Sequence, residues 1–176
     1  MPEPTQPTPI LDDATLAFAA RVFDYARTGD SARLGELLAG GLPANLRNHA
    51  GDSLLMLASY HGHLDTARLL LERGADAELR NARGQTPLAG AAFKGDLPMI
   101  ELLLDHGADV EGASPDGRTA LMIAAMFNRS AIVERLVARG ADPQARDAGG
   151  ATPLSAARMM GAVETQALLA RLDEVR

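Results

Sequence analysis

The stretch RGQTPLAGAAFKGDLPMIELLLDHGAD, residues 83–109, decides the fold of this 176-residue chain. Many of its positions recur before and after it at a fixed step of 33 residues. One such series comprises Gly51, Gly84, Gly117 and Gly150, and another comprises Leu55, Leu88, Leu121 and Leu154. Self-similarity at one step over so many positions predicts an array of like units that stack on one another.

The chemistry of this stretch predicts two short helices in each unit. Thr86 is a good N-cap, and Pro87 follows at the first helical position, where its missing N–H costs nothing. The first helix covers residues 88–94 and ends at Gly95, and the second begins near residues 97–98 and ends at Gly107. In the next copy Asn128 replaces the mid-unit glycine, and asparagine also tolerates a left-handed backbone. Two short helices cannot bury both faces alone, so the copies must pack together.

The first and last copies depart from the pattern. Residues 12–48 form a degenerate first copy with a longer first helix, whose apolar face is predicted to comprise Leu16, Ala19, Ala20, Phe23 and Ala26. Copies over 49–81, 82–114 and 115–147 follow, and a last copy over 148–172 carries Gln166 where the others are apolar. Such caps are expected at the ends of a stack. Residues 1–11, rich in proline, are predicted to form a disordered tail.

The recurring motif resembles the ankyrin repeat. Its three parts, G-x-T-P-L, A-A-x-x-G and L-L-L-x-x-G-A-D, match residues 84–88, 91–95 and 102–109. The resemblance implies an all-α solenoid of five stacked helix-turn-helix repeats with finger-like turns, capped at both ends. The histidine that ankyrin repeats usually carry after T-P-L is absent, and Met56, Ala89, Met122 and Ser155 stand there instead. We therefore expect weaker polar links between repeats and more reliance on apolar packing.

The resemblance also implies a concave groove lined by the fingers and the first helices. The variable pair before each mid-repeat glycine is expected to face it: Tyr60-His61, Phe93-Lys94, Met126-Phe127 and Met159-Met160. Aromatic and methionine side chains are enriched at protein interfaces. Finger residues would form a rim of mixed charge, comprising His49, Asp52, Arg83, Gln85, Asp116 and Arg118. Alternatively, the paired side chains are core between first helices, with Met159 and Met160 sealing the end of the stack.

Composition and motifs narrow the function further. A net charge of -6 gives no electrostatic footprint for nucleic acid or an anionic membrane, and no cysteine is present. With no long apolar run and no basic N-terminus, we expect a cytoplasmic protein. The histidines lack metal-ligand spacing, and Asp76, Asp109 and Asp142 are periodic, which indicates turn-shaping and not catalysis.

The predicted function is thus that of a non-enzymatic, cofactor-free module that is a monomer on its own and binds another protein. Two alternatives remain: self-association, or a small-ligand or metal site that uses His61 and Lys94.

Overall fold

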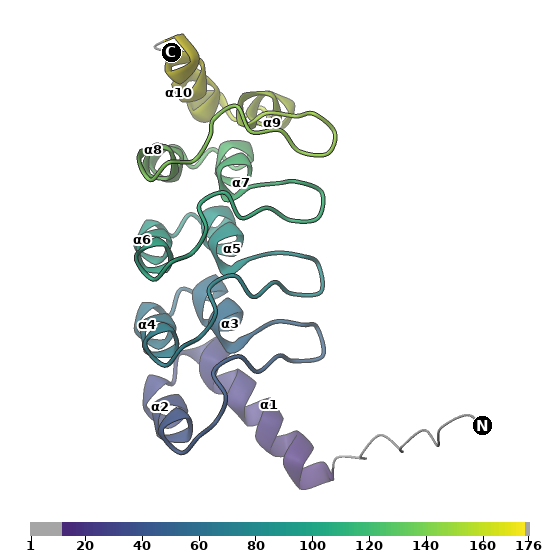
Figure 1. Cartoon of the computed structure of the whole chain (residues 1–176), viewed down its shortest axis with the longest axis vertical. Helices are drawn as coiled ribbons and strands as arrows, with labels where there is room; N and C mark the ends of the chain where they lie inside the picture. The colour runs from purple at the N-terminus through teal and green to yellow at the C-terminus, as the bar shows by residue number, and fades with distance from the viewer. Residues whose placement is uncertain (1–11, 175–176) are drawn as a thin grey trace, which may run out of the picture.

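The computed structural model describes residues 12–174, and its helices come in pairs along the chain (Figure 1). The predicted tail, residues 1–11, lies outside the described residues. The pairs are α1 (Asp13–Thr28) with α2 (Ser31–Ala39), α3 (Leu54–Tyr60) with α4 (Leu64–Glu72), α5 (Pro87–Lys94) with α6 (Leu97–Asp105), α7 (Ala120–Met126) with α8 (Ser130–Ala138), and α9 (Pro153–Met160) with α10 (Val163–Glu174).

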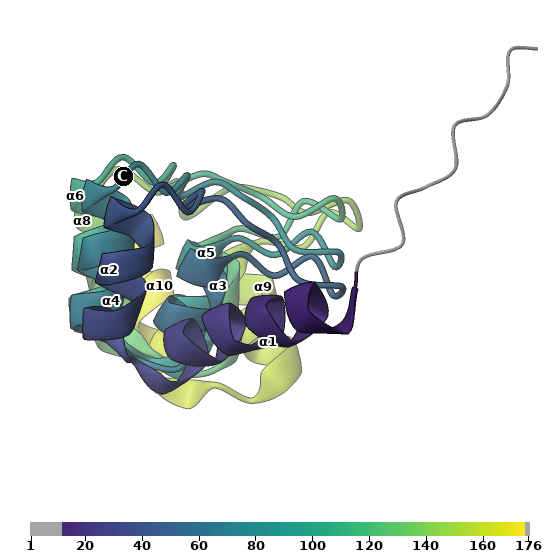
Figure 2. The same cartoon turned by 90° about the horizontal axis from the view of Figure 1, so that it is seen from below.

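These pairs stack into a solenoid. Figure 1 shows the first helices in one column and the second helices in another, with loops projecting as fingers beyond the first-helix column. Seen along the stack, the fingers lie to one side and the second helices to the other (Figure 2). Among the described residues no strand occurs, only an isolated bridge between Arg47 and Ser53. The predicted all-α solenoid is confirmed, and no helix of the described chain is long and apolar enough to cross a membrane.

Local chemistry sets the helix ends. The Thr86 hydroxyl oxygen accepts from the Ala89 amide at 3.2 Å, and Pro87 begins α5. Gly95, at φ 80°, ends the helix in a left-handed conformation. Asn128 takes the same role between α7 and α8 at φ 58°, so its predicted left-handed backbone is confirmed. Threonine or serine caps each first helix from α3 to α9, which explains why these helices begin in register.

The core runs through the stack as columns of identical residues. Leu70, Leu103 and Leu136, one on each central second helix, are fully buried. On the first helices Leu55, Leu88 and Leu121 are each 1% exposed. Each repeat therefore buries its apolar face against its neighbours, as a solenoid requires.

The expected reliance on apolar packing between repeats is observed, because Met56 and Met122, which replace the usual histidine, are buried. However, a side-chain oxygen of one repeat accepts from a turn amide of the next at three junctions. The pairs are Asn45 with the Asp76 amide at 2.8 Å, Glu78 with Asp109 at 2.9 Å, and Glu111 with Asp142 at 2.6 Å. We call these bonds the turn ladder.

The aspartates of the turn ladder also shape their own turns. The side chains of Asp76, Asp109 and Asp142 each accept from the amide two residues on, at 2.8, 2.9 and 2.9 Å. Such bonds are typical of Asx turns. The turn-shaping role predicted for these periodic carboxylates is confirmed.

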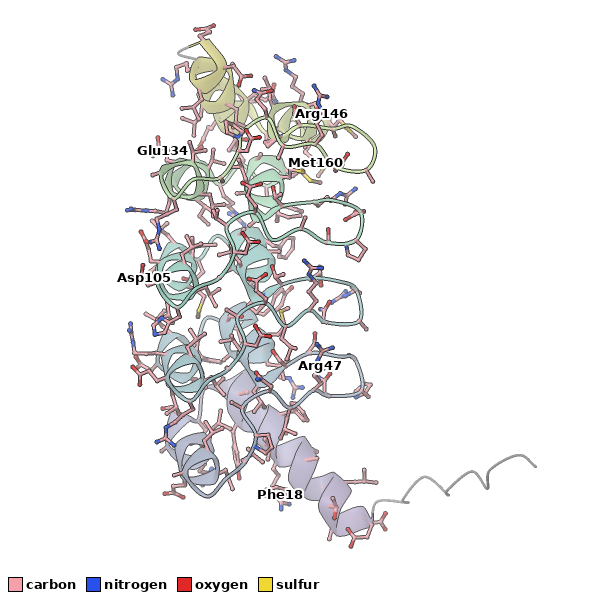
Figure 3. All side chains as sticks on the ribbon, viewed as in Figure 1. Phe18, Arg47, Asp105, Glu134, Arg146 and Met160 are labelled. Atoms are coloured by element: carbon pink, nitrogen blue, oxygen red, sulfur yellow. The ribbon has the colours of Figure 1, made fainter. Side chains whose placement is uncertain are left out.

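The first helix is longer than the others, as predicted, with 16 residues against seven or eight in the other first helices. Its predicted apolar face is only partly right. Val22 and Ala26 are buried, but Leu16 is 51% exposed and Ala20 is also exposed. Leu16 and Ala20 are exposed because α1 is longer than α3, which covers only one half of α1. Figure 1 shows the other half reaching past the stack, and Figure 3 shows Phe18 on it.

Candidate functional site

The fingers and first helices of the three central repeats enclose a groove of about 730 Å³. This volume lies within the range of roughly 300–1,000 Å³ that is common for ligand sites. Ten of the predicted site residues line it: Asp52, Tyr60, His61, Arg83, Gln85, Phe93, Asp116, Arg118, Met126 and Phe127. The groove therefore brings together the paired side chains of the first helices and the charged residues of the fingers.

Four predicted site residues lie outside this groove, and the first of them, His49, is exposed on a finger. The Lys94 ammonium stands 5.0 Å from the centre of the Tyr60 ring, at a cation–π position just beyond the lining. Met159 and Met160 are 81% and 52% exposed, so the alternative in which they seal the end of the stack is wrong. They stay exposed because α9 is the last first helix among the described residues, so no described first helix covers them.

Three aromatic side chains form a continuous row along the groove, which we call the aromatic row. The rings of Tyr60 and Phe93 are stacked at 6.4 Å between centres, and Phe93 meets Phe127 edge to face at 4.7 Å. Tyr60 and Phe93 remain 37% and 38% exposed, whereas Phe127 is half-buried. These rings are therefore neither fully buried core nor fully free groove residues, because each ring packs against its neighbour while the row keeps an accessible surface.

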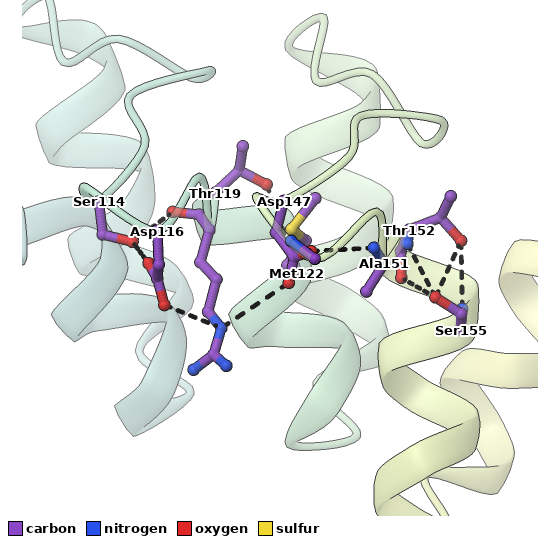
Figure 4. A network of polar contacts seen from close by, with 10 residues as sticks. Ser114, Asp116, Thr119, Met122, Asp147, Ala151, Thr152 and Ser155 are labelled. Atoms are coloured by element: carbon purple, nitrogen blue, oxygen red, sulfur yellow. Dashed lines mark hydrogen bonds and ion pairs between the residues drawn. The ribbon is translucent and has the colours of Figure 1, made fainter.

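The carboxylates on the rim are already engaged. The Asp116 carboxylate accepts from the Ser114 hydroxyl and lies 3.2 Å from the Arg118 guanidinium. The Ser114 hydrogen bond is the main reason that the pKa of Asp116 lies below its usual value, with Arg118 adding to it. Arg118 also reaches Asp147 at 4.0 Å, and Figure 4 shows Ser114, Asp116 and Asp147 around it. Asp52 accepts from the Asn81 side chain at 3.0 Å.

Arg83 differs from these residues. Its side chain is exposed on the central finger, and among residues 12–174 it makes no ion pair. Arg83 therefore brings to the groove a guanidinium that has no ion-pair partner among the described residues, although the protein as a whole is acidic.

His61 lies at one end of the aromatic row, 5.6 Å from the Tyr60 ring. Partial burial, followed by electrostatic repulsion from His63 and from the positive charges of Arg27 and Lys94, lowers the pKa of His61. The neighbouring His63 has a structural role, because its Nε2 bonds the Arg27 carbonyl of the preceding repeat at 2.8 Å. Within residues 12–174 no three His, Asp or Glu side chains gather as metal ligands would.

We expect an NMR titration to give His61 a pKa below 6.5. Lys94→Gln should raise this pKa only in part, because burial is the larger cause. Because the pKa of His61 is lower in the folded protein than in the unfolded chain, the unfolded chain binds the proton more readily. The full contribution of His61 to the free energy of unfolding is therefore present above pH 6.5 and decreases as the pH falls below it. A titration midpoint at or above 6.5 in the folded protein would contradict this assignment.

The sequence did not single out the floor of the groove. Met56, Leu57, Ala89, Gly90 and Ile123 line it, from the middle of the first helices. The prediction took only the last pair of each first helix as groove-facing. The 33-residue register could have identified the floor, since positions 57, 90 and 123 are equivalent.

Comparisons with known proteins agree with this architecture. A family model described as "Ankyrin repeats (3 copies)" matches residues 22–114, and a second, "Ankyrin repeats (many copies)", matches residues 103–157. The first covers more than half of the chain, which therefore belongs to the ankyrin repeat family.

A relative in Pseudomonas aeruginosa, named "Putative ankyrin repeat protein PA3287", is 66% identical over 63 residues. The match spans 36% of this chain and 37% of the relative.

Proposed function

We propose that this protein is a non-enzymatic interaction module whose groove binds a segment of a partner protein. Ankyrin repeats in general mediate protein–protein interactions. The observation that carries the proposal is the aromatic row, which leaves two large rings more than a third exposed inside a groove with a charged rim. Aromatic anchors surrounded by polar side chains are typical of protein interfaces.

The groove is suited to binding because it is already ordered. Asp116, Arg118 and Asp147 hold one another on neighbouring fingers, and the Asn81 side chain links Asp52 to Gln85 at 3.0 and 3.1 Å. A preformed surface loses little conformational entropy when a partner arrives. A cytoplasmic location belongs to the same proposal and is consistent with a chain that has no cysteine.

A displayed library of random 12-residue peptides, selected on the immobilised protein, tests the proposal. Each repeat advances the stack by roughly 10 Å, so a groove over three repeats can take about six extended residues. We expect the wild type to enrich binders. Tyr60→Ala, Phe93→Ala and Phe127→Ala should each weaken the selected peptides about 10-fold or more, and the triple variant should abolish binding.

Met159→Ala is the matched control, since it removes an exposed apolar side chain outside the groove and should leave binding unchanged. Urea denaturation checks the folding of each variant. If every aromatic substitution lowers the free energy of unfolding by roughly 3–5 kcal/mol, the rings act as core and the proposal is wrong. Self-association would instead appear as a dimer mass in light scattering.

A further inference from the structure

The floor of the groove is interrupted at its centre. Two equivalent positions on successive first helices hold Met56-Leu57 on α3 and Met122-Ile123 on α7. On α5, between them, the same positions hold Ala89-Gly90, and both residues line the groove. Ala89 and Gly90 thus present only a methyl group and a hydrogen atom to the groove, whereas Met56 and Leu57 on α3 and Ile123 on α7 present larger side chains. We call the resulting space the central notch.

Nothing in the fold requires glycine at position 90. Gly90 lies inside α5 and, unlike Gly95, does not have a positive φ. A Cβ atom placed there would lie 3.5 Å from the Tyr60 ring and 3.8 Å from the Met56 sulfur, which are ordinary contact distances. Glycine is unfavourable relative to alanine within a helix. The missing side chain, and not the backbone, distinguishes this residue from its equivalents, and the Tyr60 ring and the Met56 sulfur border the position.

The central notch has apolar walls. Met56 and Tyr60 stand on the side of α3, as the contacts of the added Cβ atom demonstrate. Phe93 lies three residues after Gly90, on the same face of α5. Ile123 and Met126 line the groove from α7. A partner side chain that entered the notch would therefore exchange water for methionine, isoleucine and aromatic surface, which is the setting in which binding hot spots occur.

The rim above this floor carries two arginines, Arg83 and Arg118, and two carboxylates, Asp52 and Asp116. Arg83 belongs to the finger of the same repeat and makes no ion pair among the described residues, whereas Asp52 and Asp116 are held by Asn81, Ser114 and Arg118. An arriving carboxylate finds a guanidinium without an ionic partner here, whereas Asp116 already pairs with Arg118 and Asp52 already accepts a hydrogen bond from Asn81. Charge complementarity thus favours an acidic group in the bound segment.

We propose that the groove recognises a partner segment that has two features. An aliphatic or aromatic side chain of the segment enters the central notch. An Asp or Glu a few residues before or after it pairs with Arg83. The inference rests on the proposed function and specifies its partner. The side chains absent from α5, relative to the groove-lining Met56, Leu57 and Ile123, set the size of the anchor, and Arg83 sets the sign of the neighbouring charge.

The peptide selection tests both features. Wild-type protein should enrich sequences that combine a large apolar residue with an acidic one. Arg83→Glu should weaken a selected peptide at least 10-fold, and a fresh selection on this variant should prefer Lys or Arg. Arg83→Lys is the control and should retain acidic preference. Enrichment with no acidic residue, or equal binding by Arg83→Glu, would overturn the assignment of Arg83.

Gly90→Leu, which copies Leu57 of the preceding repeat, tests the notch. It should weaken the selected peptides at least 10-fold while the protein stays folded by circular dichroism. Gly90→Ala is the gentler variant. Because alanine favours helix, we expect its Tm to be unchanged or higher by about 2–4 °C, with a smaller loss of binding than for Gly90→Leu.

The outcomes separate this inference from the proposed function. Peptides that require the aromatic row but bind Gly90→Leu and Arg83→Glu as tightly as wild type would leave the proposed function standing and overturn the inference. A library that yields no binder on wild-type protein would overturn both. If Gly90→Leu fails to fold, Gly90→Ala and the Arg83 variants decide the question.

Discussion

Leu103→Ala is expected to lower the free energy of unfolding by about 3–5 kcal/mol, the usual range for a leucine removed from a packed core. Leu103 is fully buried on α6, between the equally buried Leu70 and Leu136 of the adjacent repeats. Because each repeat contacts only its neighbours, the cavity weakens two interfaces at once. Against a total stability of about 5–15 kcal/mol, this loss is large. Urea denaturation followed by circular dichroism measures it.

Leu37→Ala is the matched control for this prediction. Leu37 occupies the equivalent position in the first repeat, where it is only half-buried because no repeat is described before it. The same chemical change should therefore cost roughly half as much or less. Equal losses at Leu37 and Leu103 would contradict the view that burial between two repeats sets the cost.

Asn128→Ala is expected to lower the free energy of unfolding by about 2–3 kcal/mol, from two separate causes. The Asn128 side-chain oxygen accepts from the amides of Glu164 and Thr165 at 3.0 and 3.1 Å, so it caps the start of α10 from the preceding repeat. Its backbone stands at φ 58°, where alanine is strained. Alanine removes the cap and adds the strain.

Asn128→Gly separates the two causes, because glycine accepts a positive φ but cannot cap. Its expected loss is about 1 kcal/mol, the usual effect of a missing cap. Thermal denaturation of both variants gives the comparison. If glycine restored wild-type stability, the hydrogen bonds to α10 would contribute nothing; if it were as damaging as alanine, backbone strain would be irrelevant.

The helices could be predicted from sequence because their ends are local chemistry. Thr86 with Pro87 marks a helix start in any surroundings, and Gly95 and Asn128 mark ends wherever the backbone must turn left-handed. The 33-residue step then extends the prediction along the chain. The same step placed Tyr60, Phe93 and Phe127 in the variable pairs that end the first helices, and their rings do lie along one groove, although Met126 and not Phe127 is the exact equivalent of Tyr60 and Phe93.

Exposure and cross-repeat bonding were harder to predict. The burial of Leu16 or Met160 depends on how far the neighbouring helix extends, and residue type carries no such information. The turn ladder did leave a signal, since Asn45, Glu78 and Glu111 are all polar at one 33-residue step. Recognising it requires knowing that each side chain reaches an amide 31 residues later, which follows only from the stacked geometry.

The turn ladder also gives the stack a direction. In each link the earlier repeat supplies the acceptor and the later repeat supplies the amide, from Asn45 to Asp76 and from Glu78 to Asp109. Trimming repeats from the C-terminal end leaves every remaining amide with its acceptor, whereas trimming from the N-terminal end takes one away. Chains leave the ribosome N-terminus first. The acceptor side chain for each newly synthesised turn is therefore already present in the preceding repeat, and the stack can be assembled in the order of its synthesis.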